Sequence, residues 1–488
     1  MKQNSQNNVI ILITTICFLY SLPLILWGGY YWDDVIRSTQ GLYGWKENAR
    51  PLADVVFYVL NGGGINANFY PLPQILAVMV MSLTIFLCWK RLLENKGLVS
   101  TLCCIPLIAA PTFVENLLFR YDALTMSMSV LFATIPAVSR LPYLTKFLLG
   151  AFCVFISLSL YQASITVFVI ISALVFVSEI RNGNYKHANK SVLISVFSLL
   201  AGYTTYSKLI AQKYLVGSYN LKHSEVLSLS DGGFLKGFTN NLDAFFTYVI
   251  KISPGMLLAS LAITALFSFI FCVCLSLKSY RSGGIHGKIS SALCLISLPV
   301  FVFCIVGPVA LLKQPVFTAR VLIGYGAFIL TCNVISMWSL PKRLAVIFAI
   351  PLIFMTIFCY TLTNSLKSQD EYEGAITRSI INDMAALNVD VQPEIAIAGR
   401  MPKSTQTRLA EKAYPIVHNL TPILVNDNSE WALQRFRQYG LSAKMVSRDI
   451  SNTILSNLCS QKRVRRGPYY DLYFSNNVMF IDFNKKCN

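Results

Sequence analysis

Long apolar runs dominate residues 9–364 of this 488-residue chain, and each is long enough to cross a bilayer. A membrane-spanning helix needs roughly 17 to 25 mainly apolar residues. Only 13% of the residues are charged, against roughly a quarter in soluble domains. The sequence therefore predicts an α-helical polytopic membrane protein with about eleven transmembrane helices. The expected spans lie near 9–29, 71–89, 97–114, 122–139, 143–161, 163–179, 191–210, 255–277, 289–311, 320–340 and 344–364.

Five connectors, one after every second expected span, are basic and nearly free of acidic residues. Cytoplasmic connectors of membrane proteins are enriched in lysine and arginine, so this alternation predicts a cytoplasmic N-terminus and an extracytoplasmic tail. The same connectors account for much of the net charge of +18, and we therefore expect no nucleic-acid partner. The basic connectors contain Lys90, Arg91 and Lys96; Arg140 and Lys146; Arg181, Lys186 and Lys190; Lys278, Arg281 and Lys288; and Lys342 and Arg343.

From residue 365 onward the composition becomes that of a soluble domain. We expect a transmembrane domain at 1–364, with an outer loop at 30–70, and an extracytoplasmic α/β domain at 365–488. At about 120 residues the tail is large enough for its own core. Its expected elements are a helix over Glu371–Leu387, a strand over Glu394–Ala398, a helix that starts after Ser429, and a hairpin of Tyr469–Phe474 with Val478–Phe483.

Two of the thirteen cysteines, Cys459 and Cys487, fall in this tail, and the others lie in or beside apolar runs. An even pair in an oxidising compartment is a disulfide candidate, with two unpaired thiols as the alternative. The four histidines are scattered along the chain and show no metal-ligand spacing, so no zinc site is expected.

Adjacent aspartates, Asp33 and Asp34, follow the first apolar run. Two carboxylates at a membrane boundary are costly to desolvate, and each raises the pKa of the other, which suits a catalytic general base. A structural alternative also fits the sequence. One carboxylate would cap a short helix while the other pairs with Arg37.

Aromatic and cationic residues gather in the same outer loops. Aromatic rings can stack on sugars or anchor the protein at the interface, and arginines can hold a phosphate. Two simpler readings remain: Arg120 and Asp122 form only a mutual salt bridge, and Lys313 and Arg320 bind only lipid headgroups. The candidate substrate-binding residues are Trp32, Arg37, Trp45, Arg50, Arg120, Asp122, Tyr161, Gln162, Lys313 and Arg320.

The sequence shows no Asp-x-Asp nucleotide-binding region, no phosphate-binding Gly-x-x-x-x-Gly-Lys loop and no Gly-x-Ser-x-Gly elbow. A nucleotide sugar would also be a cytoplasmic donor, on the face opposite the candidate residues. We therefore expect a sugar donor carried in the membrane, such as a polyprenyl-phosphate sugar.

Five motifs carry a family resemblance. They are Asp33-Asp34-x-x-Arg37, Gly44-Trp45 with Arg50-Pro51-Leu52, Arg120-Tyr121-Asp122, Ser159-Leu160-Tyr161-Gln162-Ala163 and Phe317-Thr318-Ala319-Arg320. In this order they resemble the phage-type, serotype-converting O-antigen glucosyltransferases, the Gtr enzymes of enteric bacteria.

The resemblance implies a GT-C-like glycosyltransferase of the bacterial inner membrane. It would transfer glucose from undecaprenyl-phosphate glucose to the O-antigen repeat unit of lipopolysaccharide on the periplasmic face. Asp33 or Asp34 would deprotonate the acceptor hydroxyl, and Arg37, Arg120 or Arg320 would steady the departing lipid phosphate. The functional partners would be a bactoprenol-glucose synthase and a flippase. No cofactor is required, although a divalent metal at the aspartates stays open.

Two other functions fit parts of the pattern. An O-antigen polymerase or ligase also acts on lipid-linked glycans, but would more typically carry a large arginine-bearing loop between late spans. The loop at 211–254 has no arginine. A polysaccharide or lipid-sugar transporter would line a path with charges inside its spans, and these spans are nearly free of charge.

Overall fold

The chain folds into two compact units in the computed structural model, which describes residues 2–228, 232–387, 393–427, 429–475 and 478–487. The membrane unit comprises Met1–Ile25, Tyr43–Gly64 and Phe69–Cys359. The C-terminal unit comprises Leu26–Leu42, Ile65–Asn68 and Tyr360–Asn488. The sequence places the boundary at residue 365, whereas the contacts divide the chain at residue 360 and assign two pieces near the loop at 30–70 to the C-terminal unit.

Eight helices in the described part of the chain are long and apolar enough to cross a membrane, which confirms a membrane protein. A ninth candidate is a broken segment, 98–118, whose two halves meet at 60° where Pro111 begins α6 (Pro111–Leu118). The eight contain α1 (Lys2–Trp27), α4 (Leu72–Leu92), α8 (Tyr143–Leu160), α9 (Ile165–Arg181), α10 (Tyr185–Tyr206), α14 (Gly255–Ser282), α15 (Gly284–Val306) and α17 (Ala349–Ala386).

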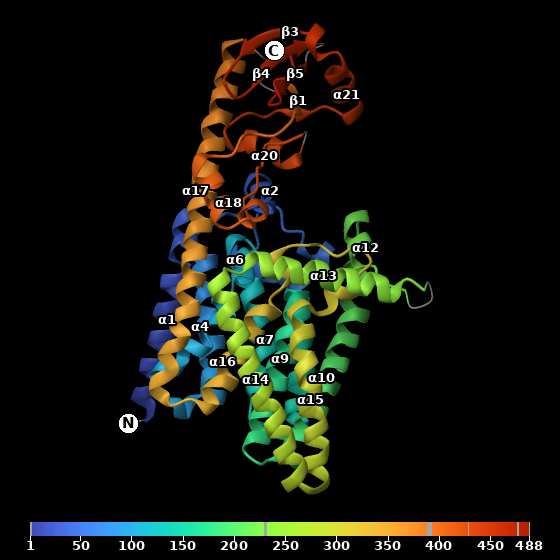
Figure 1. Cartoon of the computed structure of the whole chain (residues 1–488). Helices are drawn as coiled ribbons and strands as arrows, with labels where there is room; N and C mark the ends of the chain where they lie inside the picture. The colour runs from blue at the N-terminus through green and yellow to red at the C-terminus, as the bar shows by residue number, and fades with distance from the viewer. Residues whose placement is uncertain (1, 229–231, 388–392, 428, 476–477, 488) are drawn as a thin grey trace. The chain divides into compact units, whose positions relative to one another are not determined.

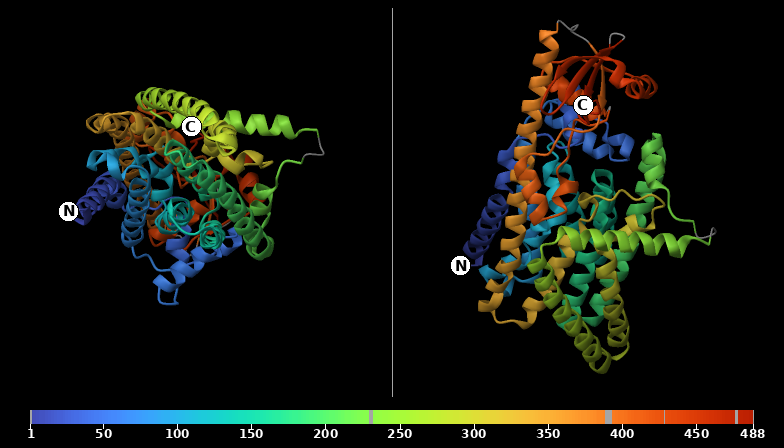
Figure 2. Two further views of the ribbon diagram at one scale, coloured as in Figure 1. Left: turned by 90° about the horizontal axis from the view of Figure 1, so that it is seen from below. Right: turned by 45° about the horizontal axis from the view of Figure 1, so that its top comes forward.

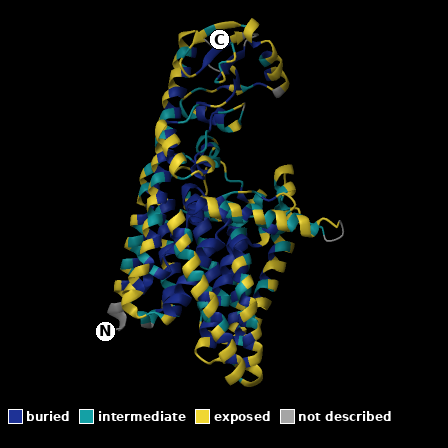
Figure 3. Cartoon of the chain, viewed as in Figure 1, coloured by how far each residue is buried: buried dark blue, intermediate teal, exposed yellow. Residues whose placement is uncertain are grey.

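Two of the expected spans correspond to shorter helices, α7 (Ala123–Val138) and α16 (Gly324–Ser339), of 16 residues each. Sixteen helical residues rise about 24 Å, less than the roughly 30 Å of a bilayer core. Both helices are mostly buried within the membrane unit, as the dark blue interior in Figure 3 illustrates. The count of eleven spans therefore stays a prediction.

The long helices of the membrane unit expose many large apolar side chains on the surface away from the core. On α14 the exposed side chains include Ile263, Leu266 and Phe267, each 59–60% exposed. Such a surface suits contact with lipid chains rather than water. The two longest connecting segments of the first 364 residues are partly helical. Segment 30–70 contains α2 (Asp33–Gln40) and α3 (Pro51–Leu60), and segment 211–254 contains α13 (Phe234–Ile252). Figures 1 and 2 show α13 lying crosswise to the long helices α14 and α15.

The C-terminal unit is built around a five-stranded mixed sheet in the order β2-β1-β5-β4-β3. β1 pairs in parallel with β2 and β5, while β4 is antiparallel to both β5 and β3. The strands are β1 (Glu394–Ala398), β2 (Lys444–Met445), β3 (Lys462–Arg466), β4 (Asp471–Ser475) and β5 (Val478–Asp482). Its shorter helices include α18 (Thr405–Ala413), α20 (Glu430–Gln438) and α21 (Arg448–Ser456).

Both faces of this sheet are covered by apolar side chains. One cluster joins Ile395 and Leu472 to Ile380 of α17 and Phe436 of α20, and the other joins Phe480 and its neighbours to α21. The predicted strand at 394–398 is confirmed as β1. The predicted helix after Ser429 is confirmed as α20, and the Ser429 side chain caps it by accepting a hydrogen bond from the Ala432 N–H. The terminal hairpin is confirmed as β4 and β5, while Asn476 and Asn477 at its turn lie outside the described residues.

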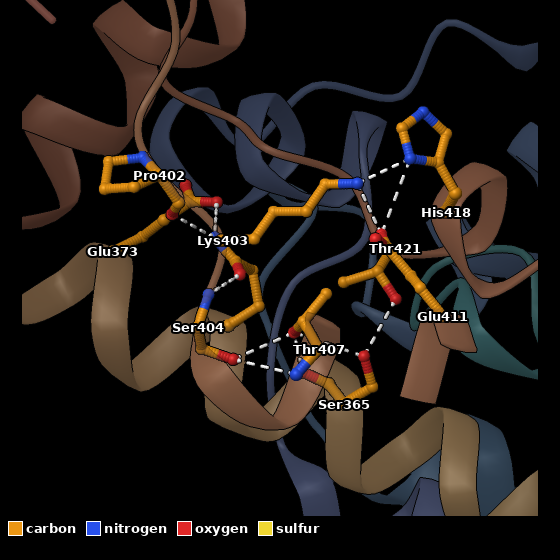
Figure 4. A network of polar contacts seen from close by, with 10 residues as sticks. Ser365, Glu373, Pro402, Lys403, Ser404, Thr407, Glu411, His418 and Thr421 are labelled. Carbon is orange, nitrogen blue, oxygen red and sulfur yellow. Dashed lines mark hydrogen bonds and ion pairs between the residues drawn. The ribbon is translucent and has the colours of Figure 1, made fainter. Parts of the chain in front are cut away.

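A polar network and one covalent link add to this core. Cys459 and Cys487 are joined by a disulfide. The Glu373 carboxylate, buried in the part of α17 that belongs to the C-terminal unit, accepts hydrogen bonds from Gln369 Nε2 (3.1 Å) and the Leu424 N–H (3.2 Å). Burial raises the pKa of Glu373 to about 7. Figure 4 shows this carboxylate among the neighbouring polar residues around Ser404.

Candidate functional site

Arg50 is fixed at the turn that leads into α3. Pro51 occupies the first position of that helix, and the preceding residue, Ala49, has a φ of 56°, in the left-handed region that non-glycine residues seldom adopt. Arg50 Nε donates to Gln162 Oε1 (2.9 Å), and its guanidinium lies 4.4 Å from the centre of the Tyr161 ring. The structure thus brings Arg50 to Tyr161 and Gln162, two predicted site residues that lie more than one hundred positions further along the chain.

Gln162 binds the backbone of the turn before α3 as well as the side chain of Arg50. Its Nε2 donates to the carbonyl of Asn48 (2.8 Å) and to the Tyr206 hydroxyl (2.9 Å). The Tyr206 hydroxyl in turn donates to the carbonyl of Ala49 (3.0 Å). Gln162 lies at the break between α8 and α9, where the predicted turn is present, so the break supplies an amide that fixes Arg50.

Trp45 forms the second part of the site. Its indole Nε1 donates to Asp122 Oδ1 (2.6 Å), and its ring stacks on Phe57 at 5.0 Å. The carboxylate of Asp54 accepts hydrogen bonds from three successive backbone N–H groups, at residues 44–46, and so shapes the loop that carries this ring. Only 1% of Trp45 is exposed, so its ring is part of the packing and not a free stacking surface.

Arg120 and Arg320 each lie over an aromatic ring. The Arg120 guanidinium is 4.2 Å from the Tyr70 ring centre, and that of Arg320 is 4.6 Å from the centre of Phe119. The backbone of Arg320 is also held, because its N–H donates to Glu115 Oε2 (2.8 Å) and its carbonyl accepts from the Tyr161 hydroxyl (3.0 Å). Tyr161 therefore contacts both Arg50 and Arg320.

The charges in this cluster favour an anion. Burial lowers the pKa of Arg50, and the positive charge of nearby Arg320 lowers it further. Tyr161 and Asp122 act in the opposite direction and raise it. A phosphate placed between partly buried guanidinium groups would relieve their mutual repulsion and accept charge-assisted hydrogen bonds. The membrane unit thus contains a cluster of Trp45, Arg50, Arg120, Asp122, Tyr161, Gln162 and Arg320. We call it the outer polar cluster, after the outer loops in which we expect its members from the sequence.

Asp33 and Asp34 open helix α2 in the C-terminal unit. Asp34 is fully buried, and its Oδ2 accepts a hydrogen bond from the Tyr31 N–H (3.2 Å), while Asp33 is partly exposed. The N-cap position belongs to Trp32, whose side chain makes no capping hydrogen bond. Its φ of 46° is unusual for a bulky residue, and such strain tends to occur at functional sites.

Helix α2 is attached to α20 within the C-terminal unit. The rings of Trp32 and Trp431 meet edge to face at 5.2 Å, and Thr39 Oγ1 donates to Gln434 Oε1 (2.6 Å). Gln438 Nε2 also donates to Ser38 Oγ (3.0 Å). The aspartate pair is therefore carried by a helix that the C-terminal unit holds in place.

The remaining predicted site residues lie elsewhere. Arg37 is in the last turn of α2, and Lys313 forms an exposed ion pair with Glu225. Within the described residues, no group of three or more His, Cys, Asp or Glu side chains is arranged to hold a metal ion.

Sequence reasoning missed three supporting residues: Asp54, Glu115 and Tyr206. Glu115 was visible as a carboxylate between two apolar runs, and only 4% of it is exposed. Asp54 and Tyr206 gave no comparable signal, because their roles depend on contacts with distant backbone groups.

Comparison with known proteins identifies the family of this chain. The family model described as Glucosyl transferase GtrII matches residues 22–331, which include both aspartates and the whole outer polar cluster. A Salmonella phage P22 protein, named as an uncharacterized 55.3 kDa protein in the gtrB 5′ region, is 28% identical over 442 residues, covering 88% of this chain and 90% of that protein. No solved structure is significantly similar. The chain belongs to the GtrII glucosyl transferase family, and it is a glycosyltransferase of the membrane.

Proposed function

We propose that this protein transfers glucose from undecaprenyl-phosphate glucose to the O-antigen repeat unit on the periplasmic face of the inner membrane, and so changes the serotype of the bacterium. The observation that carries the proposal is the match to the glucosyl transferase family over residues 22–331. The basic connectors support the orientation, because they favour an outer location for loops 30–70 and 211–254 and for the C-terminal unit.

Asp33 is the proposed general base. Its carboxylate is partly exposed, whereas Asp34 is fully buried and already accepts a backbone hydrogen bond. The acceptor hydroxyl loses its proton to Asp33 as its oxygen attacks the anomeric carbon of glucose. The bond between that carbon and the lipid phosphate oxygen breaks in the same step, so the configuration inverts. Asp34 positions the start of α2.

The outer polar cluster is the proposed site for the lipid phosphate. Arg50 and Arg320 are partly buried cations held by Gln162, Tyr161 and Glu115, so little reorganisation is needed as negative charge develops on the phosphate. Arg120 lies over Tyr70 in the same cluster and adds positive charge. A bactoprenol-glucose synthase and a flippase would supply the donor.

The proposal is tested by Asp33→Asn in cells that make O-antigen, followed by analysis of the polysaccharide for side-branch glucose. Loss of a general base typically costs about 10² to 10⁴ in rate, so glucosylation should fall below detection or nearly so. Asp243→Asn, an exposed carboxylate on α13, is the matched control and should modify normally. Full glucosylation by Asp33→Asn at normal protein level would overturn the assignment of Asp33.

A further inference from the structure

An apolar groove with a volume of about 750 Å³ runs along the membrane unit beside α8 and α10. Its walls include Phe147 of α8 and Ile194, Phe197, Ala201, Thr204 and Thr205 of α10. The groove is open along its length, and Phe197 and Leu200 beside it are more than half exposed. The groove lies between candidate membrane-spanning helices, so a ligand there would reach it from the lipid phase.

A positive charge follows the groove on the same side of α10. Phe197, Ala201, Thr204 and Lys208 are spaced by four, three and four residues, which places them on one helix face. Lys208 is exposed and belongs to a π-helical turn, Ser207–Ala211, that directly extends α10. Such turns often occur at functional sites. An apolar channel that ends at a cation suits a lipid with an anionic headgroup.

Helix α10, which carries most of the groove residues, also contacts the outer polar cluster. Tyr206 lies between the groove residue Thr205 and Lys208, and its hydroxyl donates to the carbonyl of Ala49 and accepts from Gln162. Gln162 in turn accepts from Arg50. The helix that lines the groove therefore leads to the turn that holds a proposed phosphate-binding arginine.

We propose that this groove holds the isoprenoid chain nearest the phosphate of the polyprenyl-phosphate donor, with Lys208 attracting the anionic headgroup on its way to Arg50 and Arg320. The proposal rests on the proposed function. The groove residues of α10 run from Ile194 to Thr205, a rise of about 17 Å, which accommodates the first part of one long chain. A groove that follows one helix face and is followed there by one cation favours a single-chain carrier over an ordinary two-chain phospholipid.

The test uses the full-length protein in nanodiscs and a polyprenyl phosphate that carries a photoreactive diazirine in its first isoprene units. We expect crosslinks in peptides of α8 and α10. Unlabelled undecaprenyl phosphate should compete for the site more effectively than phosphatidylglycerol. Equal competition by phosphatidylglycerol would show a general lipid site and overturn the proposal.

Ala201→Trp fills the groove and should weaken probe binding at least about tenfold, the loss expected when roughly two methylene groups leave apolar contact. Val196→Trp is the matched control, since Val196 is 46% exposed on the same helix but does not line the groove. Lys208→Gln, at an exposed position, should reduce the advantage of undecaprenyl phosphate over undecaprenol. Equal labelling of the wild-type protein and Ala201→Trp would refute the groove assignment.

The labelling and the glucosylation measurements distinguish a wrong groove assignment from a wrong proposed function. Groove labelling without glucosylation in cells would contradict the proposed function and leave the lipid site standing. Normal glucosylation by Ala201→Trp, with unchanged labelling, would contradict the groove and leave the transferase function standing.

Discussion

Glu373 gives the C-terminal unit a predictable dependence on pH. Its carboxyl is buried in the polar network of Figure 4, and burial raises its pKa from 4.5 to about 7. Between these values the folded protein keeps a proton that the unfolded chain has lost. The free energy of unfolding should therefore be highest below pH 4.5, fall as the pH rises to about 7, and then level off. The total change corresponds to about 3 kcal/mol.

Glu373→Gln removes this titration. The amide cannot accept from both Gln369 Nε2 and the Leu424 N–H, so the variant should lose one hydrogen bond, about 1 kcal/mol. We therefore expect Glu373→Gln to be less stable than the wild type near pH 4.5 and more stable, by about 2 kcal/mol, at pH 8.

Hydrogen exchange of the full-length protein in detergent measures the stability of the C-terminal unit locally, on peptides that contain β1 and β5. Glu371→Gln is the matched control, because Glu371 lies on the same helix with an exposed side chain and should leave the pH dependence unchanged. Parallel pH profiles for Glu373→Gln and the wild type would refute the reasoning.

Three further predictions concern single contacts. Gln162→Leu removes the amide that holds Arg50, and glucosylation should fall by roughly tenfold or more at equal protein level; unchanged glucosylation would contradict the positioning role. Cys459→Ser opens the disulfide to Cys487, across 28 residues, and should destabilise the C-terminal unit by about 3 kcal/mol, which the same exchange measurement would detect as faster exchange in β3. Lys313→Ala removes an exposed ion pair and should change neither stability by more than about 0.5 kcal/mol nor glucosylation; a large loss of glucosylation would restore Lys313 to the phosphate site.

Local sequence patterns predicted part of this fold well. The strand at 394–398 is bounded by residues that interrupt its apolar pattern, and the cap at Ser429 depends only on neighbours in the chain. The apolar runs predicted most spans for the same reason. They could not fix the number, because α7 and α16 are apolar yet short and buried by other helices.

The outer loops were harder to predict than the spans. Helices α3 and α13 lie inside segments expected to be loops. Helix α3 has only ten residues, and α13 has polar residues among its apolar ones. The assignment of Leu26–Leu42 to the C-terminal unit depends on contacts with α20, almost four hundred residues away in the chain. No local pattern records such a contact.

In the candidate site too, the sequence predicted the residue types but not the contacts between distant residues. The sequence identified Arg50 and Gln162 as unusual residues in outer loops, but not the hydrogen bond between them, which joins positions 112 residues apart. Trp45 was expected to offer a surface to a sugar, and its burial against Phe57 and Asp122 gives it a packing role instead. Residue type suggested the chemistry, and tertiary contacts decided which groups are available for it.

The central claim is glucosyl transfer from a lipid phosphate, with Asp33 as the base. The most direct measurement incubates the purified full-length protein with lipid-linked O-antigen and undecaprenyl-phosphate glucose labelled in the sugar, and in parallel with labelled nucleotide-linked glucose. We predict labelled O-antigen from the lipid donor alone, and its loss in Asp33→Asn but not in Asp243→Asn. Transfer from the nucleotide sugar, or full transfer by Asp33→Asn, would contradict the account.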